Sequence, residues 1–181
     1  MTDVMIDLET WGSVPGCAIR SIGAIAFDVS AAEFGHVHCN VTLASCLDVG
    51  LHVDAKTEHW WARQSDEAQL ALVRPHPINL RSALAWLSGW IASYGSPEVW
   101  SHGASFDVPV LACAYRACGI RAPWDYRRVR DTRTLYALTG FDPKSVPFEG
   151  TRHSALDDAR HQVRCVRAAF SAIGNVLGGL V

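Results

Sequence analysis

The stretch VMIDLETWG (residues 4–12) combines an apolar run typical of a β-strand with two acidic residues, Asp7 and Glu9. Successive side chains of a strand point to opposite faces, so residues two apart project from the same face. Burying two unpaired carboxylates on one face costs free energy, because both lose their hydration. A divalent cation between them would offset that cost. The alternative is that one acid is a turn residue at the strand end, beside Thr10 and Gly12.

Two further β-rich segments follow the opening strand, at residues 18–28 and 34–43, separated by a polar turn. Their partial alternation of apolar and polar side chains predicts strands, and three strands in succession favour an antiparallel meander. The pattern then becomes helical. Residues 57–73 predict one or two short helices that end before Pro75.

The second half of the chain alternates helices with strands. Asn79 is a good N-cap for an amphipathic helix. Short strands are expected over residues 98–102 and near residues 126–129, each followed by a helix, and the last helix begins at Ser154. Such alternation predicts an α/β fold in which helices cover a mixed sheet. No repeat or linker divides the sequence, so we expect a single domain over residues 1–181.

Composition excludes several classes of protein. With 49% hydrophobic and 19% charged residues, the chain has the composition of a soluble globular protein rather than of a disordered or fibrous one. A formal net charge of −2 argues against a protein that coats nucleic acid by charge alone. Six cysteines without a CxxC pair favour buried free thiols over a zinc module or a disulfide framework.

The two ends of the sequence bear on location and assembly. Residues 1–9 carry acids where a secretory signal has a basic region and an apolar core, so we expect a cytoplasmic protein. The apolar tail, residues 172–181, is too short to span a bilayer. We therefore expect no membrane association. The tail is expected to pack on the domain or on a second copy of the chain, which would make a homodimer.

A third acid lies in WSHGASFDVPVL (residues 100–111). Asp107 follows a predicted strand through Gly103 and begins a helix, where backbone N–H groups and the helix dipole favour an anion. Open α/β sheets commonly build their sites at such carboxyl ends of strands. The alternative interpretation is an ordinary acid in the first turn of a helix.

A fourth acid lies in TRHSALDDAR (residues 151–160). Ser154 and Asp157 have the spacing of a capping box, which commits Asp157 to the helix amino terminus and leaves Asp158 free. His153 lies on the loop just before that cap. A loop imidazole beside a helix acid is the arrangement of a general base near a metal ligand. Taken by itself, His153 is better explained as a surface histidine.

Together these motifs resemble the DEDDh subgroup of DnaQ-like 3′ to 5′ exonucleases. The matching set is DxET at residues 7–10, GASFD ending at Asp107, and HxAxxDA from His153, in the family's order and spacing. TEHWWARQSDEA (residues 57–68) further resembles a stretch of phage DexA-type and exonuclease VIII-type members and of related bacterial exoribonucleases. DTRTL at residues 131–135 is common in the wider family.

The resemblance implies a ribonuclease H-like fold, with a five-stranded mixed sheet, the first strand at its centre and the second antiparallel to its neighbours. It also implies that four carboxylates bind two divalent cations, Mg²⁺ or Mn²⁺, and that His153 is the general base. Converging acids without cations would repel one another, whereas two cations neutralise them and hold a phosphodiester. The implied metal-binding residues are Asp7, Glu9, Asp107 and Asp158.

The implied activity is release of nucleoside 5′-monophosphates from the 3′ ends of single-stranded DNA or RNA, or from 3′ overhangs. By the resemblance, Glu9 and the backbone near Thr10 contact the terminal sugar. Trp11 either stacks on the terminal base or covers the sheet edge. Trp60 and Trp61 likewise either stack on bases of the substrate or belong to the core.

Several alternatives stay open at this level. Six arginines between the second and third motifs either follow a phosphate backbone or form a solvated face. A nuclease-fold binding module without catalysis, or a dimeric assembly role, would use the same chain. DNA and RNA are not distinguished, because that choice depends on how the site treats a 2′-OH. The six arginines are Arg116, Arg121, Arg127, Arg128, Arg130 and Arg133.

Overall fold

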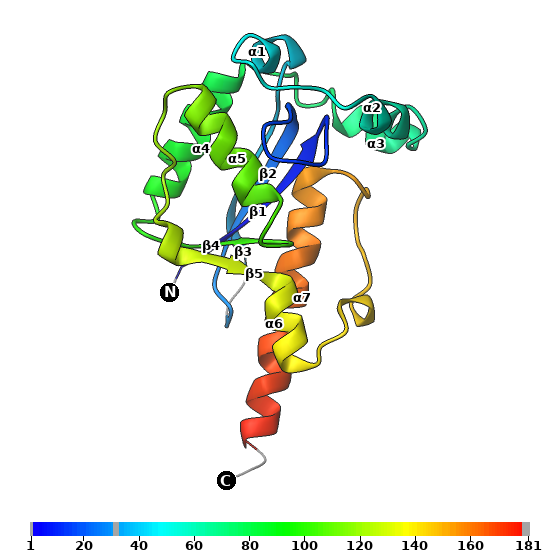
Figure 1. The fold of residues 1–181 in the computed structure, drawn as a ribbon. Helices are drawn as coiled ribbons and strands as arrows, with labels where there is room; N and C mark the ends of the chain where they lie inside the picture. The colour runs from blue at the N-terminus through cyan, green and yellow to red at the C-terminus, as the bar shows by residue number, and fades with distance from the viewer. Residues whose placement is uncertain (1, 31–32, 179–181) are drawn as a thin grey trace.

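A five-stranded mixed sheet forms the centre of the computed structural model, which describes residues 2–30 and 33–178, with side chains described up to residue 172 (Figure 1). The strand order is β3-β2-β1-β4-β5. β1 is antiparallel to β2 and parallel to β4, so the first strand is central, as predicted. The strands are β1 (Asp3–Thr10), β2 (Ile19–Phe27), β3 (Glu33–Asn40), β4 (Glu98–Ser101) and β5 (Val129–Asp131).

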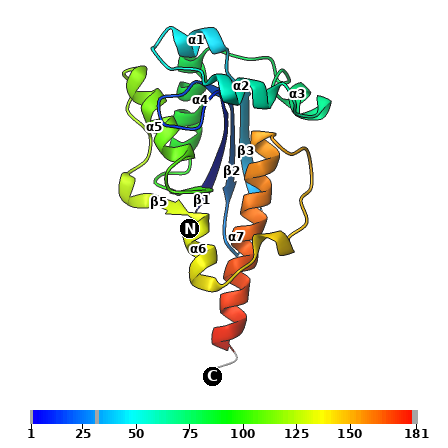
Figure 2. The same cartoon turned by 45° about the vertical axis from the view of Figure 1, so that its right-hand side comes forward.

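Helices cover both faces of this sheet, which confirms the predicted α/β class. Figure 2 shows the sheet between α4 and α5 on one side and α7 on the other. α6 packs against α7, and α1, α2 and α3 lie near the end of the sheet where β1 finishes (Figure 1). The helices are α1 (Leu43–Leu47), α2 (Ala55–Trp61), α3 (Asp66–Ala71), α4 (Leu80–Ala92), α5 (Asp107–Ala117), α6 (Thr132–Thr139) and α7 (Ala155–Gly178), with 3-10 turns η1 (Tyr126–Arg128) and η2 (Pro143–Ser145).

The alternation of side chains along β1 assigns each residue to one face. Val4, Ile6 and Leu8 belong to the large apolar cluster beneath α4 and α5. Met5 belongs to a second cluster, formed with residues of α7. Because residues two apart share a face, the acids that follow Met5 at alternate positions also face α7. The packing of the core therefore decides which helix meets the acidic face of β1.

Gly23 of β2 allows α7 to approach the sheet closely. Gly23 pairs with Asp7 of β1, and a Cβ atom at Gly23 would lie 2.2 Å from the backbone carbonyl carbon of Ala155. No side chain larger than hydrogen fits such a separation without a shift of the backbone. The first turn of α7 is thereby held next to the acidic part of β1.

Two predicted strands have different bounds in the structure. The strand expected over residues 126–129 begins only at Val129, because the Asp125 side chain accepts the Arg127 N–H at 2.9 Å and starts the turn η1. The strand expected to reach residue 43 ends at Asn40. Thr42 and Ser45 form hydrogen bonds within the next turn, and α1 begins there instead.

The predicted short helices over residues 57–73 are present as α2 and α3, with N-caps at Asp54 and Ser65. The apolar tail, residues 172–181, lies outside the described side chains except for Ala172, which is exposed. Its predicted packing therefore stays a prediction. Among the described residues, no helix is long and apolar enough to cross a membrane.

Replacing Gly23 by alanine should destabilise the protein, because the new methyl group meets backbone atoms of Ala155 that cannot rotate away. We expect the free energy of unfolding to fall by about 1–3 kcal/mol, the usual cost of overpacking. Urea denaturation followed by circular dichroism measures this loss.

Gly89→Ala is the matched control. Gly89 is exposed in α4, and apart from its chain neighbours and the backbone of its own helix no described atom lies within 4 Å of a Cβ placed there. Helix propensity predicts a gain of about 0.5–1 kcal/mol for this substitution. A Gly23→Ala variant as stable as the parent would contradict the close approach of α7 to β2.

Candidate active site

The carboxyl half of β1 directs Asp7 and Glu9 toward α7. Asp7 Oδ1 accepts a hydrogen bond at 2.6 Å from Nε2 of Gln162, a residue of α7. Glu9 is 9% exposed, and the charge of Arg20 on the neighbouring strand β2 opposes the rise in its pKa. The two acids thus lie within one strand and share one face, as the alternation in the sequence predicted.

Asp107 reaches β1 from the first residue of α5. β4 pairs with β1 from Asp3 to Met5, and further along β1 the Leu8 N–H donates to Asp107 Oδ1 at 3.1 Å. Asp107 is 3% exposed. The turn that leads to it contains Gly103 at φ +116°, a conformation that glycine adopts without strain. The predicted placement of this acid, after a strand and at a helix start, is confirmed.

The turn before α7 differs from the predicted capping box. The Thr151 N–H donates to Asp157 Oδ2 at 2.9 Å, and the His153 N–H donates to Asp158 Oδ2 at 2.8 Å. The Ser154 N–H donates to the Thr151 carbonyl oxygen at 3.3 Å. The predicted pairing of Ser154 with Asp157 and the predicted freedom of Asp158 were therefore wrong. Both acids of this first turn accept hydrogen bonds from the preceding loop.

The residues singled out in the sequence converge in the structure. Glu9, His153 and Asp158 each offer a ligand atom, and these atoms lie within 4.8 Å of one another. Asp7 adjoins this group, because the charges of Asp107, Glu9 and Asp158 all act on it. A donor set made mainly of carboxylate oxygens suits hard divalent cations such as Mg²⁺ and Mn²⁺. The residues present therefore fit the metal site that the sequence predicted.

Burial raises the pKa of every acid in this cluster. The pKa of Glu9 rises to about 8, that of Asp107 to about 7 and that of Asp158 to about 6, with burial as the largest cause in each case. The pKa of Asp7 also lies well above its ordinary value, through burial and then through the negative charge of Asp107. Bound cations would remove this mutual repulsion. The electrostatics therefore favour cation binding at neutral pH.

Two adjacent tryptophans of α2 cover His153. Trp61 is 2% exposed, and its Nε1 donates to the Thr10 carbonyl oxygen at 2.8 Å. Trp60 is 37% exposed and packs edge-to-face on the His153 ring, with 4.8 Å between ring centroids. Burial, followed by the charge of Arg152, lowers the pKa of His153, so the ring is neutral at pH 7. Trp61 is thus a core residue, and Trp60 borders the site.

The predicted substrate-facing residues Thr10 and Trp11 are largely engaged within the protein. Thr10 is 6% exposed, and its Oγ1 donates to the Gly12 carbonyl oxygen at 2.7 Å. The Arg20 guanidinium lies 3.9 Å from the centroid of the Trp11 ring and 4.5 Å from that of Trp61. Any stacking partner of Trp11 must therefore use the opposite ring face. Substrate contacts by Thr10 and Trp11 stay predictions.

The arginine cluster divides into residues with different surroundings. Arg128 Nη1 lies 3.1 Å from Glu98 Oε1, and Arg130 Nη2 lies 2.6 Å from Glu98 Oε2. These two side chains thus have a partner in the sheet. The charge of Arg133, by contrast, lowers the pKa of Asp107 and so acts on the acid cluster. A phosphate-binding role for the six arginines stays a prediction.

Sequence reasoning missed two residues of the site. Gln162 lies four residues after Asp158, so helical periodicity places both on one face of α7, and this spacing could have revealed it. Arg20 lies on β2, next to the residue that pairs with Glu9. Its contact with two tryptophans depends on residues distant in sequence, and nothing in the local pattern indicated it.

Comparison with solved structures identifies the fold. The chain resembles the nuclease domain of 3′hExo, a DEDDh family member, bound to rAMP, with a TM-score of 0.61 and 12% sequence identity. The match covers 94% of this chain and 92% of that chain. At this identity the likeness shows the fold, which is the ribonuclease H-like fold of DEDDh nucleases.

The family follows from the sequence itself. The family described as the 3′-5′ exoribonuclease Rv2179c-like domain matches residues 2–170. The chain therefore belongs to this family of 3′-5′ exoribonuclease-like domains. Among the curated proteins, none matches the sequence. The narrower likeness to DexA-type and exonuclease VIII-type members stays a prediction.

The raised pKa values predict how stability depends on pH when metal is removed. Groups whose pKa is higher in the folded state hold extra protons there, so the free energy of unfolding falls as pH rises. The free energy of unfolding is lost over the pH range from the ordinary carboxyl pKa of about 4 to the pKa of about 8 for Glu9. We therefore expect the unfolding temperature in EDTA to fall steadily between pH 5 and pH 8.

Thermal unfolding at four pH values measures this dependence, with Asp7→Asn as the control. Because this variant lacks one of the repelling charges, its unfolding temperature should fall less steeply. Added Mn²⁺ should restore the parent's stability at pH 8. A parent that becomes more stable between pH 5 and pH 8 in EDTA would contradict the electrostatics of the cluster.

Proposed function

We propose that this chain is a metal-dependent 3′ to 5′ exonuclease that shortens single-stranded RNA and releases nucleoside 5′-monophosphates. The convergence of four carboxylates with a neutral histidine is the observation that carries the proposal. The description of the family as exoribonucleases supports RNA as the substrate. It also favours catalysis over a binding module that has lost its activity.

The four acids would hold two divalent cations, Mg²⁺ or Mn²⁺. When bound, such ions neutralise the phosphodiester and stabilise the departing oxygen. Gln162 orients one of the acids, since its Nε2 donates to Asp7 Oδ1. The acids in question are Asp7, Glu9, Asp107 and Asp158.

His153 would act as the general base. Its lowered pKa leaves the ring neutral and able to accept a proton at pH 7. It takes the proton of the attacking water, which adds to phosphorus in line with the scissile bond. The phosphorus–oxygen bond to the preceding nucleotide then breaks, and its 3′ oxygen leaves with the bonding electrons. Trp60 and the Asp158 carboxylate keep the His153 loop beside the cluster.

The terminal nucleoside would be bound at the end of β1, by Glu9, by the backbone near Thr10 and by the free face of Trp11. The bond from Trp61 Nε1 to the Thr10 carbonyl oxygen fixes this part of the backbone. Base stacking of this kind is worth about 1–3 kcal/mol per base. A homodimer and a cytoplasmic location complete the proposal, and light scattering tests the first of these.

Substituting Trp11 by alanine tests the stacking contact. If the terminal base stacks there, KM for a single-stranded substrate should rise about tenfold, because one stacking contact is lost. Steady-state kinetics on an end-labelled oligonucleotide measures the change. An unchanged KM would mean that Trp11 only covers the sheet edge and the side chain of Arg20.

Digestion of end-labelled single-stranded RNA, single-stranded DNA and duplexes with recessed or overhanging 3′ ends tests the activity itself. We expect nucleoside 5′-monophosphates to be released from the 3′ end of RNA in the presence of Mn²⁺. His153→Ala should lower kcat about 10²- to 10⁴-fold, as for loss of a general base.

Asp7→Ala should abolish product release and thus exclude a contaminating nuclease. Circular dichroism of both variants confirms that they fold. If the parent binds RNA but releases no mononucleotide with either cation, the chain is a binding module rather than an enzyme. Equal rates on DNA and RNA would remove only the preference for RNA.

A further inference from the structure

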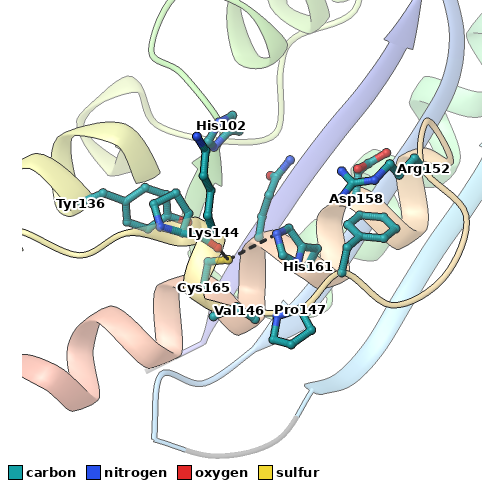
Figure 3. Close-up of a pocket in the computed structure, with 12 residues that line it drawn as sticks. His102, Tyr136, Lys144, Val146, Pro147, Arg152, Asp158, His161 and Cys165 are labelled. Atoms are coloured by element: carbon teal, nitrogen blue, oxygen red, sulfur yellow. Dashed lines mark hydrogen bonds between the residues drawn. The ribbon is translucent and has the colours of Figure 1, made fainter.

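A cavity of about 520 Å³ adjoins the acid cluster (Figure 3). It lies between α7 and the loop that joins α6 to α7. Asp158 and Gln162 belong to its wall, and Gln162 also holds Asp7, so the cavity and the cluster share residues. Its volume falls within the range of small-ligand pockets. The cavity is thus large enough for one nucleotide and is directly connected to the candidate active site.

Basic and aromatic side chains line this cavity. Lys144 and Arg152 are exposed at its wall, and Asp158 is its one acidic lining residue within the described part of the chain. The Arg152 guanidinium lies 4.6 Å from the centroid of the Phe148 ring. Lys144 has no ion pair with an acid among the described residues. Basic and aromatic side chains of this kind bind a phosphate group and a planar ring.

Two polar atoms of the same wall have no hydrogen-bond partner among the described residues. These are Nδ1 of His161 and Oε1 of Gln162, both buried. Gln162 is 8% exposed, and its Nε2 is already committed to Asp7. Unpaired buried polar groups are uncommon in folded proteins. Both residues also line the cavity, so its wall holds polar groups whose hydrogen-bonding capacity the described residues do not use.

The position of the cavity identifies its ligand. The end of β1 would take the terminal nucleoside, and the acids would take the scissile phosphate. The rest of the substrate must therefore leave on another side of the cluster. Asp158 belongs both to the group around Glu9 and to the wall of the cavity, which lies beside α7 and the loop that precedes it.

We infer that this cavity is a subsite for the nucleotide on the 5′ side of the scissile phosphate. Lys144 contacts the phosphate of that nucleotide, and Phe148 with Arg152 receives its base. This subsite rests on the proposed exonuclease function, because it binds the leaving part of the same substrate. It makes the preceding nucleotide, rather than the terminal one alone, a determinant of affinity.

The test compares two substrates that differ only on the leaving side. One is a single-stranded RNA oligonucleotide. The other is the p-nitrophenyl ester of uridine 5′-monophosphate, in which p-nitrophenolate replaces the preceding nucleotide. Lys144→Ala should raise KM for the oligonucleotide about two- to fivefold, the usual worth of one exposed ionic contact. Its kcat/KM for the ester should stay within about twofold of the parent value, a change smaller than that of such a contact.

Salt dependence gives a second readout. Removing one phosphate contact should lower the slope of log KM against log salt concentration by about 0.7 for the oligonucleotide. Lys144→Glu should raise KM further, because it repels the phosphate. Lys56→Ala is the matched control, since Lys56 is the other lysine of the chain and does not line the cavity. It should leave both substrates unaffected.

The outcomes separate the subsite from the proposed function. A parent that hydrolyses the ester and the oligonucleotide, with Lys144 variants impaired on the oligonucleotide alone, supports the subsite. Lys144 variants that match the parent on both substrates, or that lose equal activity on both, overturn it and leave the exonuclease function standing. A parent inactive on both substrates overturns the function and, with it, the subsite.

Discussion

α7 can lie against the centre of the sheet because β2 has no side chain at Gly23. The same helix carries Asp158 and Gln162, and the Asp158 carboxylate holds the loop of His153 by accepting the His153 N–H. Gly23 pairs with Asp7 on the neighbouring strand, so the point of closest approach is next to the acids. The geometry of the whole cluster therefore depends on one close backbone contact.

Concentrating carboxylates in a buried site has an electrostatic cost, which appears as raised pKa values throughout the cluster. The protein offsets part of this cost with the Leu8 N–H on Asp107, Gln162 on Asp7 and the His153 N–H on Asp158. Bound cations would relieve the remaining repulsion between the carboxylates, and this relief would add to the binding free energy. His153, at φ +63°, is held in a conformation that non-glycine residues rarely adopt.

The surroundings of the cluster differ on its two sides. Toward the end of β1, Trp61, Arg20 and Trp11 pack together, and Trp61 donates a hydrogen bond to the backbone carbonyl of Thr10. Toward α7 and the loop that precedes it, the wall opens into a basic and aromatic cavity. The packed end of β1 suits recognition of a terminal nucleoside. The open cavity suits the rest of a nucleic-acid strand, which must extend away from the acids.

The sequence by itself determined the strand with Asp7 and Glu9 on one face, Asp107 at a helix start, and the order of the motifs. These follow from side-chain alternation and helix-start chemistry, which act within a few residues. Only the tertiary structure decided the burial of Trp61 and the cavity beside Gln162. Both depend on contacts between residues far apart in the chain, where packing rather than local preference selects the geometry.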